Sequence, residues 1–339
     1  MFRGPQGRAV LIAFVVSGLA GAHGCGGGTS GTSTRLRIGL DFTVSGYHAP
    51  WFVAQEEGFF LDEGLDVVIN RGFGSGETVR QLAAGAFDIG FANPAPIIIA
   101  ISEGQPLRIV MSYFVNEMCS LYSYAEHGNV RSLSDLQGKT WGDLDGNVCG
   151  ILREPLTRAA GVDLSSIKLL NMAVAARIPA LVQGSIDVTG SFYDWDVLFE
   201  QAGAAAGLTL VTVRYSEFLS LYSNSIFVTA EFAEEHPDAV TGFVRALRRG
   251  LEYSIRNPDQ AATIVRTRFP ELDSVYVHRS VRLLATAAVD TNNASRPLGY
   301  IDAQKMEETI ETVVRLWHLP SPPEPQDVYT NRFVSPPGN

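Results

Sequence analysis

The chain has 339 residues, of which 46% are hydrophobic and 18% are charged, and its formal net charge is -10 at pH 7. This composition is that of a folded globular protein and excludes a disordered chain. Because no stretch resembles a basic stripe, binding to nucleic acid is excluded as a function.

The N-terminus has the pattern of a secretory signal. Two arginines precede an apolar run at residues 9–16, which is shorter than the about 20 apolar residues of a membrane-spanning helix. Small residues follow as far as Cys25, and the Gly/Ser/Thr-rich residues 26–34 are typical of a flexible tether. Residues 1–25 are therefore predicted to be a signal peptide that exports the chain.

The position of Cys25 resembles a bacterial lipoprotein processing site, at which the cysteine is lipidated and becomes the new N-terminus. Lipid on Cys25 would anchor the protein to the membrane, on its periplasmic side or at the cell surface. The alternative is cleavage near residue 22, which releases a protein with a spare thiol. Either outcome places the mature chain outside the cytoplasm.

Strands and helices alternate along the first part of the mature chain. Strands are expected at residues 36–40, 66–70, 88–91 and 108–112, and helices at residues 50–60, 77–84 and 95–103. Strands separated by helices predict βαβ units and a parallel sheet.

The same alternation restarts at residue 121. Strands are expected at residues 121–124, 140–143, 167–170 and 187–190, a helical turn at 133–136, and helices at 150–160 and 174–183. In residues 82–89 a helix ends, a glycine follows, and an aspartate opens a buried strand. Residues 181–188 repeat this layout. The repeated layout indicates two lobes of similar construction, which the chain length also suggests. The alternative is that any helix-to-strand junction has this layout.

The last part of the chain is predicted to be helical. After a strand at residues 225–228, helices are expected at 237–257, 261–268, 275–288 and 303–316, and a Pro-rich extended segment at 320–325. Such a tail is expected to pack on the first lobe. Two cysteines of the mature chain, Cys119 and Cys149, either pair in the oxidising compartment or stay as buried free thiols.

Short segments spread over nearly the whole mature chain carry a family resemblance. They are GLDF at 39–42, HAPWFVA at 48–54, EGFF at 57–60, GSG at 74–76, LAAGAFD at 82–88, GKT at 138–140, PELD at 270–273 and YTN at 329–331. Together they resemble the solute-binding proteins of ABC importers, in the superfamily of thiamine pyrimidine-precursor, taurine, alkanesulfonate and nitrate binders. The spacing of residues 40–43 to His48 is most similar to the pyrimidine-precursor branch.

This resemblance implies an α/β protein with the two-lobed type II periplasmic-binding-protein fold and a helical C-terminal tail packed on the first lobe. The chain would cross between the lobes near residues 114–120 and 214–223. Lobe 1 would hold residues 35–116 and 224–339, and lobe 2 residues 117–223. The implied partners are a small-molecule ligand and an ABC permease in the membrane, and the protein is expected to be a monomer.

The expected ligand is a small flat heterocycle such as a thiamine pyrimidine precursor, hydroxymethylpyrimidine or formylaminopyrimidine. Taurine, alkanesulfonates, nitrate and riboflavin stay open, because related branches bind them. The competing class is a pyrimidine-precursor synthase, which consumes its own histidine beside a pyridoxal phosphate on lysine and carries clustered cysteines. This chain has three lysines in no evident cofactor setting and no cysteine cluster, so no catalysis, cofactor or metal is expected.

Ligands of open α/β sheets bind beyond the carboxyl ends of the strands, where this sequence places aromatic and short polar residues. Such residues stack a flat ring and form hydrogen bonds with its edge. The candidate ligand-binding residues are Asp41, Phe42, His48, Phe73, Gly74, Ser75, Gly76, Asn93, Asn116, Glu117, Tyr193, Trp195, Tyr222 and Asn224. Core packing is the alternative for the aromatic residues, and helix capping or turn formation for the acids and amides.

The run GFGSGE at residues 72–77 follows a strand and opens a helix, which is the setting of an anion-binding loop. It lacks the Lys-Ser/Thr of a nucleoside-triphosphate loop and the full dinucleotide fingerprint, and Glu77 would repel phosphate. The expected contact at this loop is a polar ligand edge or a sulfonate, and no nucleotide.

Overall fold

The computed structural model describes residue 1, residues 33–290 and residues 295–335. The predicted signal peptide, the predicted lipidation site Cys25 and nearly all of the predicted tether lie outside the described residues. Thr34, the last residue assigned to the tether, instead begins the first strand. Among the described residues, no helix is both long and apolar enough to cross a membrane.

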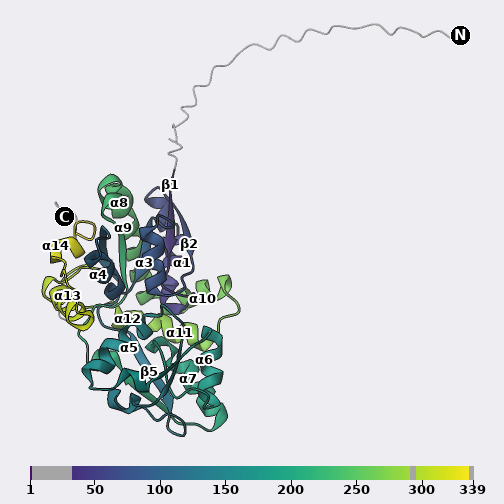
Figure 1. Ribbon diagram of the computed structural model, residues 1–339. Helices are drawn as coiled ribbons and strands as arrows, with labels where there is room; N and C mark the ends of the chain where they lie inside the picture. The colour runs from purple at the N-terminus through teal and green to yellow at the C-terminus, as the bar shows by residue number, and fades with distance from the viewer. Residues whose placement is uncertain (2–32, 291–294, 336–339) are drawn as a thin grey trace, which may run out of the picture. The chain divides into compact units, whose positions relative to one another are not determined.

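A five-stranded sheet with the order β2-β1-β3-β10-β4 forms the centre of lobe 1 (Figure 1). Its strands are β1 (Thr34–Gly39), β2 (Leu65–Asn70), β3 (Ile89–Ala92), β4 (Leu107–Ser112) and β10 (Ser225–Thr229). Strand β1 pairs in parallel with β2 and β3, as predicted. Strand β10 is antiparallel to β3 and β4, so the prediction of a parallel sheet is wrong there. The chain re-enters the sheet beside Ala92 and Ser112, where those strands end.

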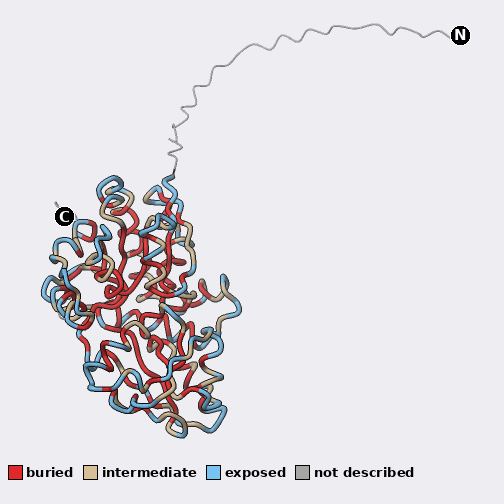
Figure 2. The backbone as a smooth tube through the Cα atoms, in the orientation of Figure 1, coloured by how far each residue is buried: buried red, intermediate tan, exposed pale blue. Residues whose placement is uncertain are grey.

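Four helices connect the strands of the first half. They are α1 (Ala49–Glu56), α2 (Phe59–Asp62), α3 (Ser75–Ala83) and α4 (Pro94–Ser102). The single helix expected at 50–60 is divided, because Gly58 adopts a left-handed conformation with φ 73°. The strands β3, β10 and β4 are buried almost throughout. The interior of the upper part of the molecule is red, and therefore buried, in Figure 2.

Lobe 2 repeats this strand arrangement. Its elements are β5 (Cys119–Tyr124), β6 (Thr140–Asp143), α5 (Val148–Ala159), β7 (Lys168–Asn171), α6 (Val174–Val182), β8 (Thr189–Phe192), α7 (Asp196–Ala206) and β9 (Leu210–Arg214). Strand β6 is parallel to β7, whereas β5 is antiparallel to both β8 and β9. A parallel bridge between Trp141 and Val188 connects the two sets. The sequence did not predict α7 and β9, because α7 is rich in small residues and has little apolar periodicity.

The repeated layout noted in the sequence has the same structural role in both lobes. Gly85 and Gly184 each follow the end of a helix with positive φ, 75° and 69°. The carboxylate of Asp88 then accepts a hydrogen bond from the backbone N–H of Arg37 at 2.7 Å, and that of Asp187 accepts one from Thr140 at 2.7 Å. Each aspartate therefore ties its own strand to a neighbouring strand, which favours the two-lobe interpretation of the repeat.

The C-terminal part of the chain is helical, as predicted. Its helices are α8 (Ala230–Glu235), α9 (Pro237–Arg256), α10 (Pro258–Arg268), α11 (Ser274–Arg282), α12 (Leu284–Ala287), α13 (Ala303–Trp317) and α14 (Pro325–Val328). Helix α9 packs on α1 and α13 packs on α4, so the tail covers lobe 1. Helix α11 also contacts the 3-10 helix η4 (Tyr193–Trp195) and α7 of lobe 2. The helix expected at 275–288 is divided at Leu283.

The segments that join the two lobes run side by side. The backbone carbonyl of Asn224 accepts hydrogen bonds from the N–H groups of Tyr113 and Phe114, at 3.1 and 3.0 Å. The N–H of Ser223 donates to the carbonyl of Phe114 at 3.1 Å. This paired backbone lies near both predicted crossings, and the lobe boundaries at residues 116 and 223 stay a prediction.

Cys119 of β5 and Cys149 of α5 form a disulfide with a Cα–Cα distance of 5.4 Å, so the two cysteines are not free thiols. A bond between residues 30 positions apart is expected to stabilise the protein by about 3.7 kcal/mol, because it restricts the unfolded chain. Reductant should lower the free energy of unfolding of the wild-type protein by that amount in urea titrations. The same reductant should leave the Cys119→Ala/Cys149→Ala variant unchanged, and an equal loss in both proteins would contradict the prediction.

Candidate ligand-binding cleft

A cavity of ≈ 330 Å³, its open mouth included, lies beyond the ends of strands of both lobes. Its lining residues are Asp41, Phe42, Tyr47, Gly74, Ser75, Asn147, Val148, Ser191, Phe192, Asp194 and Trp195. Asp41, Phe42, Gly74, Ser75 and Trp195 belong to the residues proposed from the sequence. The cavity is therefore the candidate binding site, and it is built from both lobes.

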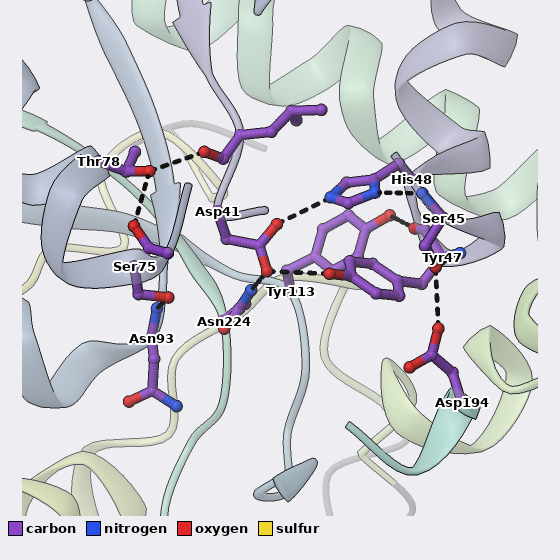
Figure 3. Close-up of polar contacts among 12 residues, drawn as sticks. Asp41, Ser45, Tyr47, His48, Ser75, Thr78, Asn93, Tyr113, Asp194 and Asn224 are labelled. Atoms are coloured by element: carbon purple, nitrogen blue, oxygen red, sulfur yellow. Dashed lines mark hydrogen bonds and ion pairs between the residues drawn. The ribbon is translucent and has the colours of Figure 1, made fainter. Parts of the chain in front are cut away.

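Asp41 follows β1 and is held by three donors, two from the 3-10 helix Gly46–His48 and one from Asn224 (Figure 3). Its carboxylate accepts hydrogen bonds from the Tyr47 hydroxyl at 3.0 Å, from Nε2 of His48 at 2.8 Å, and from the side-chain amide of Asn224. Only 3% of Asp41 is exposed. Both carboxylate oxygens of Asp41 already accept hydrogen bonds. Asp41 therefore contributes its negative charge to the cavity rather than a free hydrogen-bond acceptor.

His48 fixes the orientation of Asp41 from behind the cavity wall. Its Nδ1 accepts the backbone N–H of Ser45 at 3.1 Å, so the ring proton is on Nε2, which donates to Asp41. His48 is fully buried and does not line the cavity. Asn224 is buried in the same way. Both residues were predicted to contact ligand, and the structure instead gives them contacts with the carboxylate of Asp41.

Asp194 connects the two lobes at the opposite wall. It lies in η4 of lobe 2, and its Oδ2 accepts hydrogen bonds from Ser45 Oγ at 2.8 Å, Tyr276 OH at 3.0 Å and Ser280 Oγ at 3.1 Å. Its Oδ1 is buried and has no hydrogen-bond partner among the described residues. Burial raises the pKa of Asp194 to about 7, and the charge of Asp41 adds to the rise.

Aromatic side chains from both lobes line the cavity: Phe42, Tyr47, Phe192 and Trp195. The rings of Tyr47 and Phe192 approach to 5.8 Å between centroids. The rings of Trp195 and Tyr276 pack in a T-shaped arrangement with 6.1 Å between their centroids. This contact holds the indole in place from the side of lobe 1. Such a set of rings suits a flat apolar ligand face.

Gly74 and Ser75, at the start of α3, face residues that precede and open α5. The N–H of Gly74 donates to the carbonyl of Asp41 at 2.8 Å, and φ of Gly74 is 123°. A Cβ on Gly74 would lie 2.4 Å from the carbonyl oxygen of Gly146, across the cleft. Only glycine therefore allows this close approach of the two lobes.

Several predicted residues lie outside the lining. Phe73 is 52% exposed and lies against the Arg71 guanidinium, 4.6 Å from the ring centroid. Gly76 faces Ile151. Tyr193 is partly buried, and its ring faces Arg214 at 5.3 Å.

The remaining predicted residues form structural hydrogen bonds. Asn93 caps α4 by accepting the N–H of Ala95, and its amide donates to Glu117 at 3.0 Å. Glu117 also accepts the N–H groups of residues 118 and 119, while burial raises its pKa. Asn116 is exposed and accepts a hydrogen bond from Lys305 at 2.8 Å. The Tyr222 hydroxyl accepts the backbone N–H of residue 302. Among these residues, Asn93 makes the helix cap that was the alternative to a ligand contact.

The lining residues missed from the sequence are Tyr47, Asn147, Val148, Ser191, Phe192 and Asp194. Asp194 lies between Tyr193 and Trp195, which were selected, so taking the whole segment after β8 would have found it. Asn147 and Val148 open a helix after a strand, as Gly74 and Ser75 do. The sequence repeat between the lobes, applied to the loop before α5, would have pointed to Asn147 and Val148.

The chain has the two-lobed periplasmic-binding-protein fold. The alkanesulfonate-binding protein SsuA from Xanthomonas axonopodis pv. citri, bound to MOPS, has a similar fold with a TM-score of 0.68 and 16% identity, over 89% of this chain and 100% of that chain. Residues 45–261 match the family model described as NMT1/THI5 like. The chain belongs to the NMT1/THI5-like family.

Several sequence relatives are binding proteins by name, and the names of two of them give a ligand. The formylaminopyrimidine-binding protein of Halalkalibacterium halodurans is 25% identical over 87% of this chain and 89% of its own length. The riboflavin-binding protein RibY of Chloroflexus aurantiacus is 23% identical over 89% of this chain and 87% of its own length. Relatives named 4-amino-5-hydroxymethyl-2-methylpyrimidine phosphate synthase also match, so membership of the family does not by itself separate binding from catalysis.

Proposed function

We propose that this protein is the extracytoplasmic substrate-binding component of an ABC importer and that it captures a small flat heterocycle rich in N–H donors. A thiamine pyrimidine precursor, hydroxymethylpyrimidine or formylaminopyrimidine, fits this description. The observation that carries the proposal is the charge of the cavity. Asp41 and Asp194 line it, and none of the described lining residues is Lys or Arg.

The two carboxylates favour hydrogen-bond donors over anions. A sulfonate or nitrate in the cavity would lie close to both acids, and two like charges 4 Å apart repel by about 4 kcal/mol at an effective dielectric constant of 20. The unpartnered Oδ1 of Asp194 needs a donor instead. The amino group of an aminopyrimidine supplies one, whereas nitrate and a sulfonate group supply none. Nitrate and alkanesulfonates without a donor group are therefore the less favoured ligands. Taurine carries an ammonium donor, and only its sulfonate end is disfavoured by the two acids.

The size of the cavity favours a ligand with one ring. The cavity is narrow: its empty space of ≈ 330 Å³ includes the open mouth, so the enclosed part is smaller. A single pyrimidine ring stacked on Trp195 or Phe42 would need the smallest opening of the lobes. Riboflavin, with three fused rings and a ribityl chain, would need the lobes to stand further apart.

The site also supports binding over synthase chemistry. The synthase class uses a histidine that reacts and a lysine that holds pyridoxal phosphate. Here both ring nitrogens of His48 are engaged in hydrogen bonds within the protein, and the ring is fully buried. The described lining residues include no lysine. We therefore propose no catalytic residue and no cofactor.

The proposed role includes partners at the membrane. The closed protein would present both lobes to an ABC permease as a monomer, and lipid on Cys25 would keep it near that permease. Closure over the ligand is a shift between open and closed populations, which the ligand drives by its preference for the closed state.

A thermal-shift screen of the mature domain, without residues 1–25, tests the proposed function. The panel contains hydroxymethylpyrimidine, formylaminopyrimidine, riboflavin, taurine, methanesulfonate and nitrate. A ligand that binds only the native state raises the melting temperature by mass action. We expect a rise with the pyrimidines and none with the anions, whereas a rise with the anions alone would contradict the proposal.

Trp195 and Tyr193 provide a matched pair for the position of the ligand. Trp195 lines the cavity, and its neighbour Tyr193 faces Arg214 instead. Trp195→Ala should weaken pyrimidine binding by at least about fivefold, because it removes an aromatic face worth about 1 kcal/mol or more. Tyr193→Ala should change the dissociation constant by less than about threefold in the same fluorescence or calorimetric titration. Equal losses in both variants would place the ligand elsewhere.

A further inference from the structure

A buried ion pair lies behind the lobe 2 wall of the cavity. Arg177 of α6 is fully buried, and its Nη1 donates to the carbonyl of Gly190 at 2.6 Å and to Oδ1 of Asp143 at 3.2 Å. Asp143, at the end of β6, is 7% exposed. Neither residue lines the cavity.

Both ends of this pair touch residues that do line the cavity. The guanidinium carbon of Arg177 lies 5.2 Å from the ring centroid of Trp195, in a cation–π geometry. The same Oδ1 of Asp143 accepts a hydrogen bond from the Asn147 side-chain amide at 2.7 Å, and that amide also approaches the carbonyl of Gly190 at 3.4 Å. The pair therefore connects an aromatic wall and a polar wall of the site, which come from different elements.

Stability alone does not account for the pair. Nε and Nη2 of Arg177 are buried and have no hydrogen-bond partner among the described residues. Burying donors without acceptors is costly, and well-packed apolar residues of similar volume often give an equal or more stable fold than a buried ion pair. A buried ion pair of this kind is explained if it fixes the positions of neighbouring side chains, here Trp195 and Asn147.

We propose that Arg177 and Asp143 are positioning residues that hold Trp195 and Asn147 in the geometry of the bound state. Arg177 supports the outer face of the indole, so the opposite face is fixed for the ligand ring. Asp143 fixes the amide of Asn147 against the edge of the cavity. This inference rests on the proposed function, because it assigns a role within the same site.

The chain contains a matched control pair in lobe 2. Arg214 donates to Asp196 at 2.9 Å, and its guanidinium carbon lies 5.3 Å from the ring centroid of Tyr193. This second pair repeats the same combination of an ion pair and a cation–π contact. None of Arg214, Asp196 and Tyr193 lines the cavity.

The test compares variants by ligand titration and by thermal melting, with hydroxymethylpyrimidine and formylaminopyrimidine as probes. Arg177→Met/Asp143→Asn removes both charges together, so no single charge is left buried. We expect it to weaken binding by about tenfold or more, because the site walls lose their fixed geometry. Arg177→Lys keeps the charge but not the flat guanidinium, and it should retain the melting temperature while losing affinity. Arg214→Met/Asp196→Asn should retain wild-type affinity.

The outcomes separate this inference from the proposed function. If wild-type protein binds neither pyrimidine, the proposed function fails. If wild-type protein binds and both Arg177 variants bind equally well, the positioning role is contradicted. An affinity loss of the same size in the Arg214 control pair would also contradict it, because the effect would then be a general response of lobe 2. Should the double variant fail to fold, the Arg177→Lys titration decides alone.

Discussion

Replacing Asp194 with Asn should make the closed form of the protein more stable above pH 7 and remove part of the gain in stability that the wild-type protein shows as the pH falls. Burial in the closed cleft raises the pKa of Asp194 to about 7, above its value in the unfolded chain. The folded state therefore holds this proton more tightly than the unfolded state does. The resulting stabilisation is complete below the unfolded pKa of about 4 and is lost as the pH rises through about 7.

For Asp194 alone, the free energy of unfolding should fall by up to about 1.4 kcal/mol per pH unit as the pH rises from about 4 to about 7. Asn imitates the neutral acid: its Oδ1 can accept the three hydroxyl groups now bound by Oδ2, and its amide takes the place of the unpartnered oxygen. Urea titrations of both proteins from pH 5 to pH 8 measure the difference.

Glu117 and Asp143 also have pKa values raised by burial, so the wild-type curve alone would not isolate Asp194. The difference between the wild-type and Asp194→Asn curves removes their contribution. Parallel curves for the two proteins would show that Asp194 titrates normally and would contradict the closed, buried arrangement of this carboxyl group.

Gly74→Ala should weaken ligand binding by about a hundredfold, because the closed cleft has no room for the added methyl group. The new Cβ would lie 2.4 Å from the carbonyl oxygen of Gly146, which is closer than real Cβ contacts come. To relieve the clash the lobes must separate at the edge of the cavity. Titration of the variant with the pyrimidine that binds wild-type protein gives the ratio of dissociation constants.

Gly85 provides the control for Gly74, since it also has positive φ and lies in lobe 1. A Cβ on Gly85 would have no atom within 4 Å. Gly85→Ala should lose about 1 kcal/mol of stability through backbone strain and keep wild-type affinity. Similar affinities for Gly74→Ala and Gly85→Ala would show that contact between Gly74 and Gly146 is not needed for binding.

Much of the fold follows from local patterns in the sequence. The strand at 140–143 was predicted with the bounds observed, and the long amphipathic helix at 237–257 differs by one residue. Apolar runs and helix periodicity determine such elements locally. The direction of β10 was not predictable in this way, because it depends on how the chain returns from the other lobe.

The candidate site was partly predictable for a similar reason. The rule that ligands bind beyond strand ends selected Asp41, Phe42, Gly74, Ser75 and Trp195, which lie together. The rule could not tell that Phe42 lines the cavity and Phe73 does not, because the direction of a loop side chain depends on tertiary packing. The roles of His48 and Asn224 as donors to Asp41 also required the three-dimensional structure.

The central claim is that two buried carboxylates make this cleft a site for a donor-rich heterocycle and not for an anion. Isothermal titration calorimetry of the mature domain with hydroxymethylpyrimidine, formylaminopyrimidine and methanesulfonate, in one buffer at pH 7.5, tests it most directly. The account predicts saturable binding of at least one of the two pyrimidines, weakened by Asp194→Ala, and no heat of binding from the sulfonate. Saturable binding of methanesulfonate with none of either pyrimidine would contradict it.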